Sequence, residues 1–573
     1  MEELNFLQKK KISTFMIQLK YLRETRGCFY YKLELTFEHI SQFLVSQLIS
    51  EEVADSAMGQ TASRIKDSST PSESTGPYAS SVPSIHSTDS GSFPLGVQTA
   101  TPRRPLSSKR SHELFEADEA NKTEAVIPSK KAKEHLLYLD YPFFNDIRTK
   151  DYIKNSKIMF IMKGISGSGK STVANTIRDT FPHSYHSADA FFNKTGEYIF
   201  EFEKLKEAHQ FCQKGSIEEA EKHQNVIIID NTNVRNWEMK LYLDLAKMYQ
   251  YVVIVVEPKT PWYKDAEELA KKNQHGVSEE IIMKKVKMYQ EPCPLYYGWF
   301  VNETDSITLL EIGKNWLKNA LEELPYFFTD FSAQSGKLTK EEMINYFTRE
   351  SFYHGNSMLH CTAMFTGRGS QPDAKEYMKK QEVVDSLGKY FELNIIGFVI
   401  TPRTLGARIQ LSTDQLELWN QNDAEETPDY IRIYPQKDQG NKGNKQKNNN
   451  DDSAEVTIPE YSEHKREFDC VGTIKEVDQD LGQNRFNPTF GKGSRAHITN
   501  GCASNVRPVT TGLDIIDTVC AEQIYMTEAS ENGESLVKSF KISGAVLRQY
   551  ENGLWVVYPD KKVIVGSIFS GAY

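Results

Sequence analysis

Residues 157–171 read Lys-Ile-Met-Phe-Ile-Met-Lys-Gly-Ile-Ser-Gly-Ser-Gly-Lys-Ser. The apolar run at the start of this stretch predicts a buried strand, and residues 171–178 predict a helix after it. Between strand and helix, Gly164 to Ser171 satisfy the phosphate-binding loop pattern G-x-x-x-x-G-K-[ST]. A strand, a glycine-rich loop and a helix in this order predict an α/β domain whose loop cradles phosphate groups.

Each residue type in the loop has a physical task. Glycines let backbone N–H groups close around phosphate oxygens, and the helix N-terminus adds partial positive charge. Lys170 would reach the β- and γ-phosphates, and Ser171 would bind a magnesium ion. The predicted nucleotide-binding residues of the loop are Gly164, Gly167, Gly169, Lys170, Ser171 and Thr172.

Two acidic residues extend this predicted site. Asp230 follows an apolar run at 226–229, where phosphate-loop enzymes carry an aspartate that orients magnesium. Asn231-Thr-Asn233 comes next, at the carboxyl end of the strand, which is the usual ligand face of an open α/β sheet. Asp189 suits the orientation or deprotonation of a hydroxyl acceptor, and suits equally the N-cap of a short helix.

Two tripeptides of the form His-x-Thr lie far apart in the chain, His360-Cys-Thr362 and His497-Ile-Thr499. On a strand, residues i and i+2 point to the same face, so each tripeptide presents an imidazole beside a hydroxyl. Two such strands facing each other supply two proton carriers and two hydroxyl donors. Hydrolysis of a phosphodiester needs these groups, as base, acid and donors to the phosphoryl oxygens.

Length and composition limit the class of protein. A chain of 573 residues is too long for one hydrophobic core, so several domains are expected. The formal net charge of −10 argues against a general nucleic-acid coating role, although a locally basic groove is compatible with it. Seven scattered cysteines and the lack of a secretory pattern favour an intracellular protein with reduced thiols. No apolar run approaches 18 residues, so no transmembrane segment is expected.

The first 135 residues differ from the rest. Residues 1–56 form an N-terminal segment with an amphipathic helix expected at 37–49, which would pack on its own protein or dock on a partner or membrane surface. Residues 57–135 are rich in Ser, Thr, Pro and Gly and predict a disordered linker. Its basic clusters at 103–110 and 130–133 suit solvated charge, nuclear import or contact with RNA.

Two folded domains are expected after the linker, at 136–322 and 326–573. The first alternates strands and helices, which is typical of a parallel sheet covered on both faces. Its buried strands are expected at 158–162, 226–229 and 251–256. The second mixes helices with strands expected at 391–400, 407–411, 554–558 and 563–569. Within it, residues 421–490 hold fifteen acidic and nine basic residues and predict an acidic, mobile insertion.

The combination of the GxxxxGKS loop, Ser187-Ala-Asp189 and Asp230-Asn-Thr-Asn233 resembles the 5′-polynucleotide kinase family. The resemblance implies binding of ATP or GTP, with magnesium at Ser171 and Asp230, and phosphorylation of a 5′-hydroxyl of RNA or DNA. The lid of that family normally offers arginines, whereas this chain has Lys271-Lys272, which equally suit plain surface charge. Lysine lacks the bidentate fork of arginine, so nucleotide binding is the expectation and kinase activity the alternative.

The paired tripeptides resemble the 2H phosphoesterase superfamily, whose fold is a bilobal sheet pair with one motif per lobe. From about residue 137 to 573, outside the insertion, further segments resemble the 2′,3′-cyclic-nucleotide 3′-phosphodiesterase (CNPase) family. Within this family the chain is most similar to the regeneration-induced homologues, which implies a role in the nervous system and in axon regeneration. These segments are Leu295-Tyr-Tyr-Gly-Trp-Phe300, Leu359-His-Cys-Thr362, Thr404-Leu-Gly-Ala-Arg408, Leu416-Glu-Leu-Trp419, Gly493-Ser-Arg-Ala-His-Ile-Thr499, Gly501-Cys-Ala503 and Ile568-Phe-Ser-Gly571.

This resemblance implies hydrolysis of nucleoside or RNA-terminal 2′,3′-cyclic phosphates to 2′-phosphates without a metal. His497 would activate water and His360 would protonate the departing 3′-oxygen. Thr362 and Thr499 would donate hydrogen bonds to phosphoryl oxygens.

Two further residues are implied as substrate-binding. Arg495 would add positive charge near the phosphate, or would only pair with a surface carboxylate. Phe365 would stack on the base, or would belong to the core. The sequence stops at Tyr573 without the prenylated cysteine box of the myelin enzyme, so either this form is cytoplasmic or the sequence is cut short; peripheral membrane association stays open.

The expected protein is therefore an α/β, kinase-like phosphate-loop domain joined to an α+β bilobal 2H phosphoesterase domain, behind a disordered N-terminal extension. Its expected partners are 2′,3′-cyclic nucleotides or RNA 3′ ends, with cytoskeletal proteins as a further possibility, and the expected state is a monomer. One alternative is an RNA-repair enzyme that phosphorylates 5′-hydroxyls. Another is a cytoskeletal or RNA-binding scaffold that works through the N-terminal region and the insertion.

Overall fold

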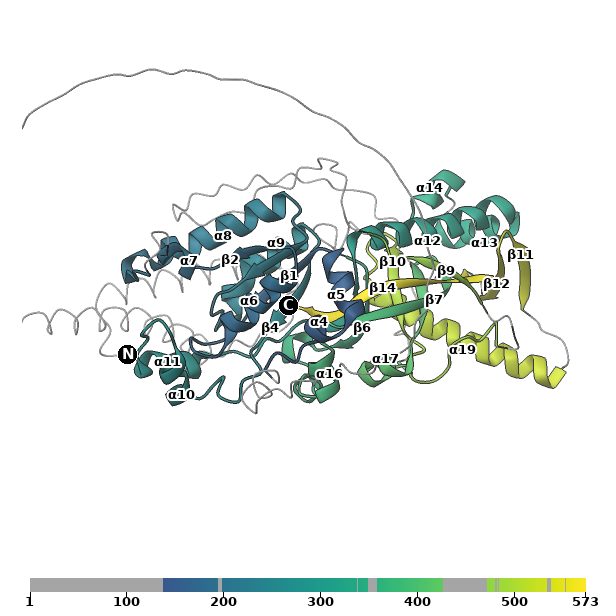
Figure 1. Ribbon diagram of the computed structural model, residues 1–573. Coiled ribbons are helices and arrows are strands. Elements are labelled where there is room, and N and C mark those ends of the chain that lie inside the picture. Colours follow the sequence, from purple (N-terminus) through teal and green to yellow (C-terminus); the bar gives the residue numbers. More distant parts are fainter. Residues whose placement is uncertain are drawn as a thin grey trace, which may run out of the picture. The chain divides into compact units, whose positions relative to one another are not determined.

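The computed structural model describes residues 138–573 except 194–197, 337, 349–357, 426–470, 480–481, 483, 533–536 and 552 (Figure 1). The helix expected at 37–49, the linker and its basic clusters lie outside the described residues. Residues 121–573 form one unit, which contains both sheets of the structure. Within the described ranges, no helix is long and apolar enough to cross a membrane.

The first domain is built on a four-stranded parallel sheet in the order β2-β3-β1-β4. Its strands are β1 (Ile158–Met162), β2 (Ser184–His186), β3 (Val226–Ile229) and β4 (Val252–Val256). β1 and β3 are buried at every position, because helices cover both faces of the sheet. These two strands confirm the predicted ranges, and β4 begins one residue later than predicted. β2 was not predicted, since its half-buried Ser-Tyr-His sequence lacks an apolar run.

Alternate residues of β1 point to opposite faces of this sheet. Ile158 and Phe160 belong to the core formed with α5 and α6, and Met159 and Ile161 belong to the core formed with α8 and α9. The helices of this domain are α4 (Pro142–Asn145), α5 (Ile147–Lys154), α6 (Lys170–Thr180), α7 (Asp189–Phe192), α8 (Leu205–Glu221), α9 (Lys240–Met248), α10 (Ala266–Lys272) and α11 (Glu279–Met288).

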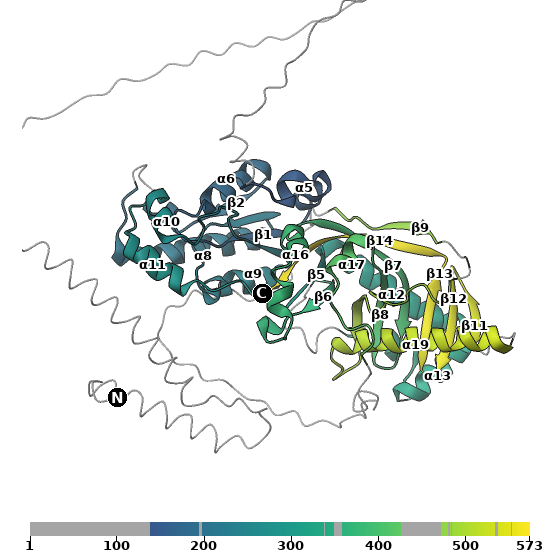
Figure 2. The same ribbon diagram turned by 90° about the horizontal axis from the view of Figure 1, so that it is seen from below.

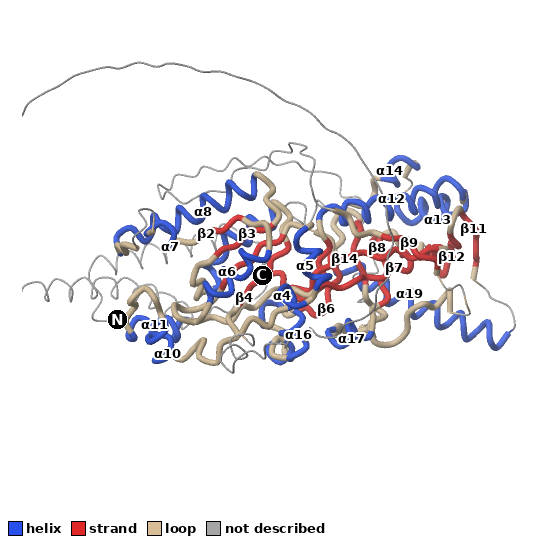
Figure 3. Tube along the Cα trace, in the orientation of Figure 1, coloured by secondary structure: helices blue, strands red, loops and turns tan. Residues whose placement is uncertain are grey.

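Ten antiparallel strands form one continuous sheet in the second domain (Figures 2 and 3). The main path is β11-β12-β13-β7-β14-β5-β6, while β8 pairs with β7 and β10, and β9 pairs with β14. The strands are β5 (Tyr296–Val301), β6 (His360–Phe365), β7 (Tyr390–Ile400), β8 (Thr404–Gln410), β9 (Lys475–Asp478), β10 (His497–Cys502), β11 (Lys538–Ile542), β12 (Ala545–Glu551), β13 (Leu554–Pro559) and β14 (Lys561–Ala572).

The long strand β7 joins the two lobes of this sheet. Residues 390–395 of β7 pair with β14, residues 398–400 pair with β13, and residues 394–400 pair with β8. The branch β7-β14-β5 ends at β6, which carries the first His-x-Thr motif. The branch β7-β8 ends at β10, which carries the second. The expected arrangement of two lobes with one motif each therefore takes the form of two branches of one sheet.

Helices cover both faces of the second sheet. α12 and α13 pack on the main core through Leu317 and Phe327, and α19 packs on the opposite side through Ile515 against Val399 and Val556. The helices of this domain are α12 (Glu303–Glu323), α13 (Pro325–Ser335), α14 (Lys340–Ile344), α15 (Ala374–Tyr377), α16 (Gln381–Ser386), α17 (Thr413–Leu418) and α19 (Val509–Asn532).

The strand pairing corrects the predicted domain boundary at 322–326. β5 pairs with β14 and β6 in the second sheet, and Trp299 of β5 belongs to the core of that sheet. The second domain therefore begins near residue 293 and includes all of α12. A run such as Tyr-Tyr-Gly-Trp-Phe identifies a strand, but its partners come from residues 360–365 and 567–572, which local patterns do not reveal.

The predicted insertion 421–490 is also too wide. Residues 426–470 lie outside the described part, but β9 pairs with β14, and Thr473 is anchored before it. The Thr473 hydroxyl donates to Asp305 Oδ2 at 2.7 Å and accepts from the N–H of Gly566 at 2.7 Å. The chain on the C-terminal side of the insertion is thus fixed to the sheet by 473.

Candidate active site

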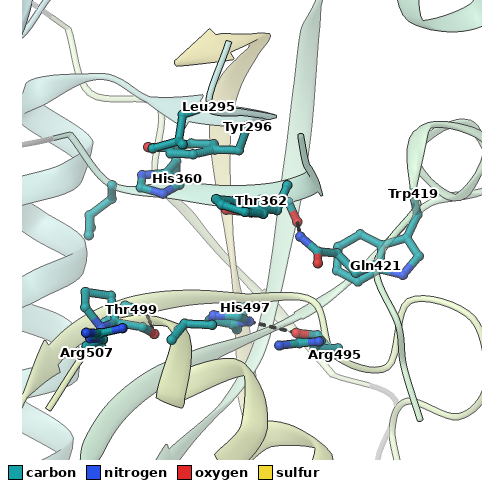
Figure 4. Close-up of a pocket in the computed structure, with 14 residues that line it drawn as sticks. Leu295, Tyr296, His360, Thr362, Trp419, Gln421, Arg495, His497, Thr499 and Arg507 are labelled. Atoms are coloured by element: carbon teal, nitrogen blue, oxygen red, sulfur yellow. Dashed lines mark hydrogen bonds between the residues drawn. The ribbon is translucent and has the colours of Figure 1, made fainter. Parts of the chain in front are cut away.

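The two motif strands, β6 and β10, present their side chains to one pocket of about 570 Å³ (Figure 4). His360 and Thr362 of β6 and His497 and Thr499 of β10 all line it. The other lining residues are Leu295, Tyr296, Leu359, Phe365, Trp419, Gln421, Arg495, Arg507, Pro508 and Val509. The two motifs, 137 positions apart in sequence, are therefore brought together around one cavity, as the tripeptide pattern predicts.

Both motif histidines are oriented by the same kind of hydrogen bond. His360 Nδ1 lies 3.2 Å from the carbonyl oxygen of Met358, and His497 Nδ1 lies 2.8 Å from that of Arg495. A carbonyl oxygen only accepts, so Nδ1 carries the proton in both rings. The Nε2 atom of each ring is then the one that exchanges a proton: it accepts when the ring is neutral and donates when the ring is charged.

The surroundings of His497 favour its neutral form. Burial lowers the pKa of His497 to about 4; the hydrogen bond to the Arg495 carbonyl opposes this shift, and the positive charges of Arg495 and His360 add to it. The imidazole of His497 is therefore neutral at pH 7 and has the form of a general base. His360 lies against an aromatic wall, its ring stacked on Tyr296 with centroids 4.7 Å apart.

The low pKa of His497 predicts activity that persists in mild acid. For a substrate of this pocket, the acid limb of the kcat/KM profile is expected near pH 4, where the folded protein protonates His497, and not near the ordinary value of 6.5. A pH–rate profile checks this expectation, with circular dichroism at each pH to show that the protein is folded. An acid limb near pH 6.5 in folded protein would contradict it.

Stability has a different pH dependence. The unfolded chain binds a proton at His497 below pH 6.5, whereas the folded chain does so only near pH 4. The contribution of this group to the free energy of unfolding is therefore lost progressively as the pH falls from 6.5 towards 4.

The second motif lies beside the first turn of α19. The hydroxyl of Thr499 donates to Thr511 Oγ1 at 3.0 Å and lies 3.4 Å from the carbonyl oxygen of Pro508. The N-terminus of this long helix carries partial positive charge, which favours an anion in the pocket. In the first motif, the backbone carbonyl of Thr362 accepts from Gln421 Nε2 at 3.5 Å.

Gly512 allows α19 to approach the second motif. A Cβ atom at this position would lie 2.8 Å from Arg495 Nε and 2.8 Å from His497 Cε1. Real Cβ atoms do not approach neighbours so closely, so a larger residue would displace one of these side chains. Gly512 was not predicted as a site residue, because a glycine inside a helical pattern carries no signal of what packs against it.

Arg495 is buried directly before β10 and is bound from several sides. Its backbone N–H donates to Asp423 Oδ1 at 2.9 Å, and its guanidinium donates to the Asn422 carbonyl at 3.1 Å and pairs with Glu425. Arg495 therefore does pair with a carboxylate, as one of the two predicted alternatives has it, but its side chain also lines the pocket. The Glu425 carboxylate holds the guanidinium as a phosphoryl oxygen would, so an anionic substrate would compete with it.

Phe365 is 44% exposed at the end of β6, which excludes the alternative that it is a core residue. Its ring lines the pocket and is accessible to a planar group. The lining residues Tyr296, Trp419, Gln421 and Arg507 were not predicted as site residues. Tyr296 and Trp419 lie in segments that carry the family resemblance, which was the available signal.

In the first domain, the phosphate loop connects β1 to α6. Gly167 and Gly169 have φ angles of 86° and 91°, in the left-handed region that favours glycine. Thr260 Oγ1 donates to the Ser168 carbonyl at 2.9 Å, and Trp262 Nε1 donates to the Gly167 carbonyl at 3.3 Å. These bonds engage carbonyl oxygens that would otherwise repel a phosphate.

Asp230 joins the phosphate loop to the end of β3. Lys170 Nζ lies 2.9 Å from Asp230 Oδ1, and the Tyr185 hydroxyl donates to Asp230 Oδ2 at 2.8 Å. Burial raises the pKa of Asp230, but Lys170 and the hydroxyl groups of Tyr185 and Ser171 outweigh burial and lower it. An ionised carboxylate beside the Ser171 hydroxyl fits the oxygen ligands that magnesium takes in such loops. Gly164 begins the loop, and Thr172 is exposed in the first turn of α6.

Asp189 is the first residue of α7, and Ala188 takes the N-cap position, so the N-cap alternative is wrong. The Tyr198 hydroxyl donates to Asp189 Oδ1 at 3.2 Å, and His275 Nε2 lies 3.7 Å from Asp189 Oδ2. The Asp189 side chain is half exposed, at 49%. It is thus available to a ligand, although the structure gives it no contact with the phosphate loop.

The predicted lid lysines bind their own helix. Lys271 pairs with Glu267 and Glu268 at 2.7 and 3.1 Å, and Lys272 lies over the Trp262 ring at 4.3 Å. The alternative of surface charge at a helix C-terminus is therefore the better description of these lysines. Lys285 of α11, which the sequence analysis missed, interacts electrostatically with Lys170 and Asp189, and burial lowers its pKa.

Comparison with known proteins assigns families to both domains. A model described as "AAA domain" matches residues 159–292, which contain the four strands of the first sheet from Met159 onward. A model described as "2′,3′-cyclic nucleotide 3′-phosphodiesterase (CNP or CNPase)" matches residues 293–436 and 475–573. The second domain belongs to the CNPase family. The two matches meet directly before β5, at the boundary that the strand pairing gives, and the gap at 437–474 lies within the predicted insertion.

Similar proteins cover the chain to different extents. A 2′,3′-cyclic-nucleotide 3′-phosphodiesterase of Pongo abelii is 28% identical over 76% of this chain and 87% of its own length. The NEDD4-binding protein 2 of Homo sapiens is 40% identical over 23% of this chain and 8% of its own length. A solved structure titled "Structure of Pnkp1/Rnl/Hen1 complex" covers 22% of this chain and 40% of its own at 22% identity, with a TM-score of 0.18, too low to support an argument about the fold.

Proposed function

We propose that the CNPase-family domain hydrolyses 2′,3′-cyclic phosphates of nucleosides or RNA ends to 2′-phosphates. The observation that carries this proposal is the meeting of two His-x-Thr strands at one pocket, with both Nδ1 atoms held by carbonyls. A cyclic phosphate between two such strands has a base on one side and an acid on the other. All groups that the reaction requires are side chains of this chain, so no metal is required.

In the proposed mechanism, Nε2 of neutral His497 takes a proton from water, and the water oxygen bonds to phosphorus. The bond from phosphorus to the 3′-oxygen breaks, and protonated His360 gives its Nε2 proton to that oxygen. The Thr362 hydroxyl donates to one non-bridging oxygen, and the Thr499 hydroxyl turns from Thr511 to donate to the other; negative charge increases on these oxygens in the transition state. The lowered pKa of His497 supports its role as the base.

Two further residues would hold the substrate. The Arg495 guanidinium would leave Glu425 and bind a phosphoryl oxygen, and its burial makes this charge effective. The exposed ring of Phe365 would stack on the base.

The test of this proposal is turnover of 2′,3′-cyclic NADP⁺ by the full chain in EDTA, followed through NADP⁺ with a coupled dehydrogenase. Steady turnover that is unchanged by the chelator is expected. No turnover, or turnover that requires added metal, would reject the proposal.

We also propose that the first domain binds ATP or GTP with magnesium. Lys170 would bind the β- and γ-phosphates, and Ser171 with Asp230 would hold the ion, which would screen the phosphate charge. The ionised Asp230 and the left-handed glycines of the loop support this proposal. The Lys170–Asp230 pair would open when a nucleotide binds, because the phosphates offer Lys170 a stronger partner.

Lys170→Met is expected to weaken nucleotide binding by at least ~10-fold, since a charge-assisted hydrogen bond contributes about 1.5–3 kcal/mol. Titration with a fluorescent ATP analogue measures this change. Lys271→Met, which removes a lysine held by its own helix, is the matched control and should leave the affinity unchanged. Equal affinity of the Lys170 variant and the wild type would contradict the assignment.

For localisation, we propose the cytoplasm. In the described part, Cys212 and Cys361 are buried and form no disulfide. Free buried thiols fit a reducing compartment.

A further inference from the structure

A second pocket of about 440 Å³ adjoins the candidate active site. The two cavities share Leu295 and Tyr296, so the wall of the catalytic pocket behind His360 is also a wall of the second pocket. Its other side comes from the first domain, through α9 and β4. The second pocket therefore extends from the wall of the catalytic pocket to the first domain.

The second pocket combines aromatic walls with free positive charge. Lys247 and Arg368 line it, and neither side chain has a hydrogen bond or an ion pair among the described residues. Asp244, an acidic residue of the lining, is paired with Lys240. Tyr251 and Phe300 add aromatic surface, and Phe300 is also close to His360, with ring centroids 5.6 Å apart.

Arg368 is held in an unusual turn. It has a φ of 56° between Gly367 and Gly369, whose φ angles are 56° and 85°. The left-handed region is unfavourable for an arginine, so the surrounding structure must impose it. The N–H of Gly367 donates to the carbonyl of Leu295 at 3.0 Å, which ties the turn to the shared wall. Strained backbone conformations cluster at functional sites, where a side chain is held in a fixed position. Here the strained turn holds Arg368 at the second pocket.

We propose that the second pocket binds the nucleotide upstream of a terminal 2′,3′-cyclic phosphate, which makes an RNA 3′ end the preferred substrate. The upstream base would lie on the aromatic surface, and the phosphate that links the two nucleotides would be bound by Lys247 and Arg368. This inference rests on the proposed function, because the cyclic phosphate would occupy the first pocket. A mononucleotide would fill the first pocket alone and leave both cations without a partner.

The proposal gives the contact between the domains a role in recognition. Lys247 comes from α9 of the first domain, whereas Arg368 follows β6 of the CNPase-family domain. Neither domain alone would supply both cations. RNA rather than DNA is the matching polymer, because only a ribose carries the 2′-hydroxyl from which a 2′,3′-cyclic phosphate is built.

The test compares two substrates of the full chain: 2′,3′-cyclic AMP and an adenosine trinucleotide that ends in a 2′,3′-cyclic phosphate. For the wild type, kcat/KM is expected to be at least ~10-fold higher with the trinucleotide and to fall with salt. The double variant Lys247→Glu/Arg368→Glu should lose this preference through KM and leave the mononucleotide unchanged. The matched control Lys214→Glu/Lys379→Glu reverses two exposed lysines that line neither pocket and should retain the preference.

The outcomes separate this inference from the proposed function. A trinucleotide preference that survives in the double variant, or an equal loss with both substrates, would overturn the inference. If the wild type hydrolyses neither substrate, the proposed function fails. The inference about the second pocket is then tested separately, by measuring RNA binding. Fluorescence anisotropy with a labelled RNA hexamer ending in a 2′-phosphate should then show weaker binding to the double variant than to the control variant, and equal binding would overturn the inference.

Discussion

His497→Ala is expected to lower kcat for a 2′,3′-cyclic nucleotide by roughly 10²–10⁴-fold, the usual contribution of a positioned general base. The neutral ring of His497 has its Nε2 lone pair free to take a proton from water, because the Arg495 carbonyl holds Nδ1–H. Alanine removes this acceptor and leaves hydroxide in bulk water as the only base. Initial rates at saturating substrate measure the loss.

The same measurement on His360→Ala should give a loss of similar size, since it removes the acid for the 3′-oxygen. His183→Ala, which removes an exposed histidine of the first domain, is the matched control and should retain full activity. The melting temperatures of the variants distinguish lost chemistry from lost folding. Wild-type turnover by a folded His497 or His360 variant would remove that residue from the mechanism.

The largest effect on stability is expected at a buried ion pair behind the second motif. Arg408 and Glu522 are fully buried, with Arg408 Nη2 2.7 Å from Glu522 Oε2, and the Tyr558 hydroxyl donates to Glu522 Oε1 at 2.6 Å. Glu522→Gln would leave the Arg408 charge buried without a counter-charge, which costs about 3–5 kcal/mol of the free energy of unfolding. Arg408 lies opposite His497 in the β8–β10 pairing, so catalysis should decline with it.

Denaturant unfolding of the full chain measures this loss. Glu476→Gln breaks an exposed pair with Lys561 in the same sheet and should change the free energy of unfolding by less than about 0.5 kcal/mol. The double variant Arg408→Met/Glu522→Leu removes both charges and should be more stable than Glu522→Gln. A loss as small as that of Glu476→Gln would show that the buried pair does not hold β10 in place.

The residues whose roles are local were predictable from the sequence. The phosphate loop is a strand, a turn and a helix within fifteen consecutive residues, and its glycines are required by the left-handed angles found at 167 and 169. Each His-x-Thr motif presents both side chains to one face because of the period of two in a strand. The resemblance then identified the family, which the comparison of the second domain bears out.

The residues that the sequence did not reveal act through contacts between distant segments. Glu425 reaches Arg495 across 70 positions, and Gly512 matters only because α19 presses against His497. The predicted domain boundary was wrong for the same reason, since the strands that pair with β5 come from far along the chain. For Lys271 and Lys272 the sequence left a lid and plain surface charge as equal alternatives, and the contacts with Glu267 and Trp262 favour surface charge.

The identity of the product tests the central claim most directly. The full chain in EDTA should convert 2′,3′-cyclic AMP into a single product, 2′-AMP, as followed by ³¹P NMR, because in the proposed mechanism His360 protonates only the 3′-oxygen. The same result is expected for an RNA ending in a cyclic phosphate. A 3′-phosphate, a mixture of the two isomers, or no hydrolysis without metal would contradict catalysis by the paired histidines.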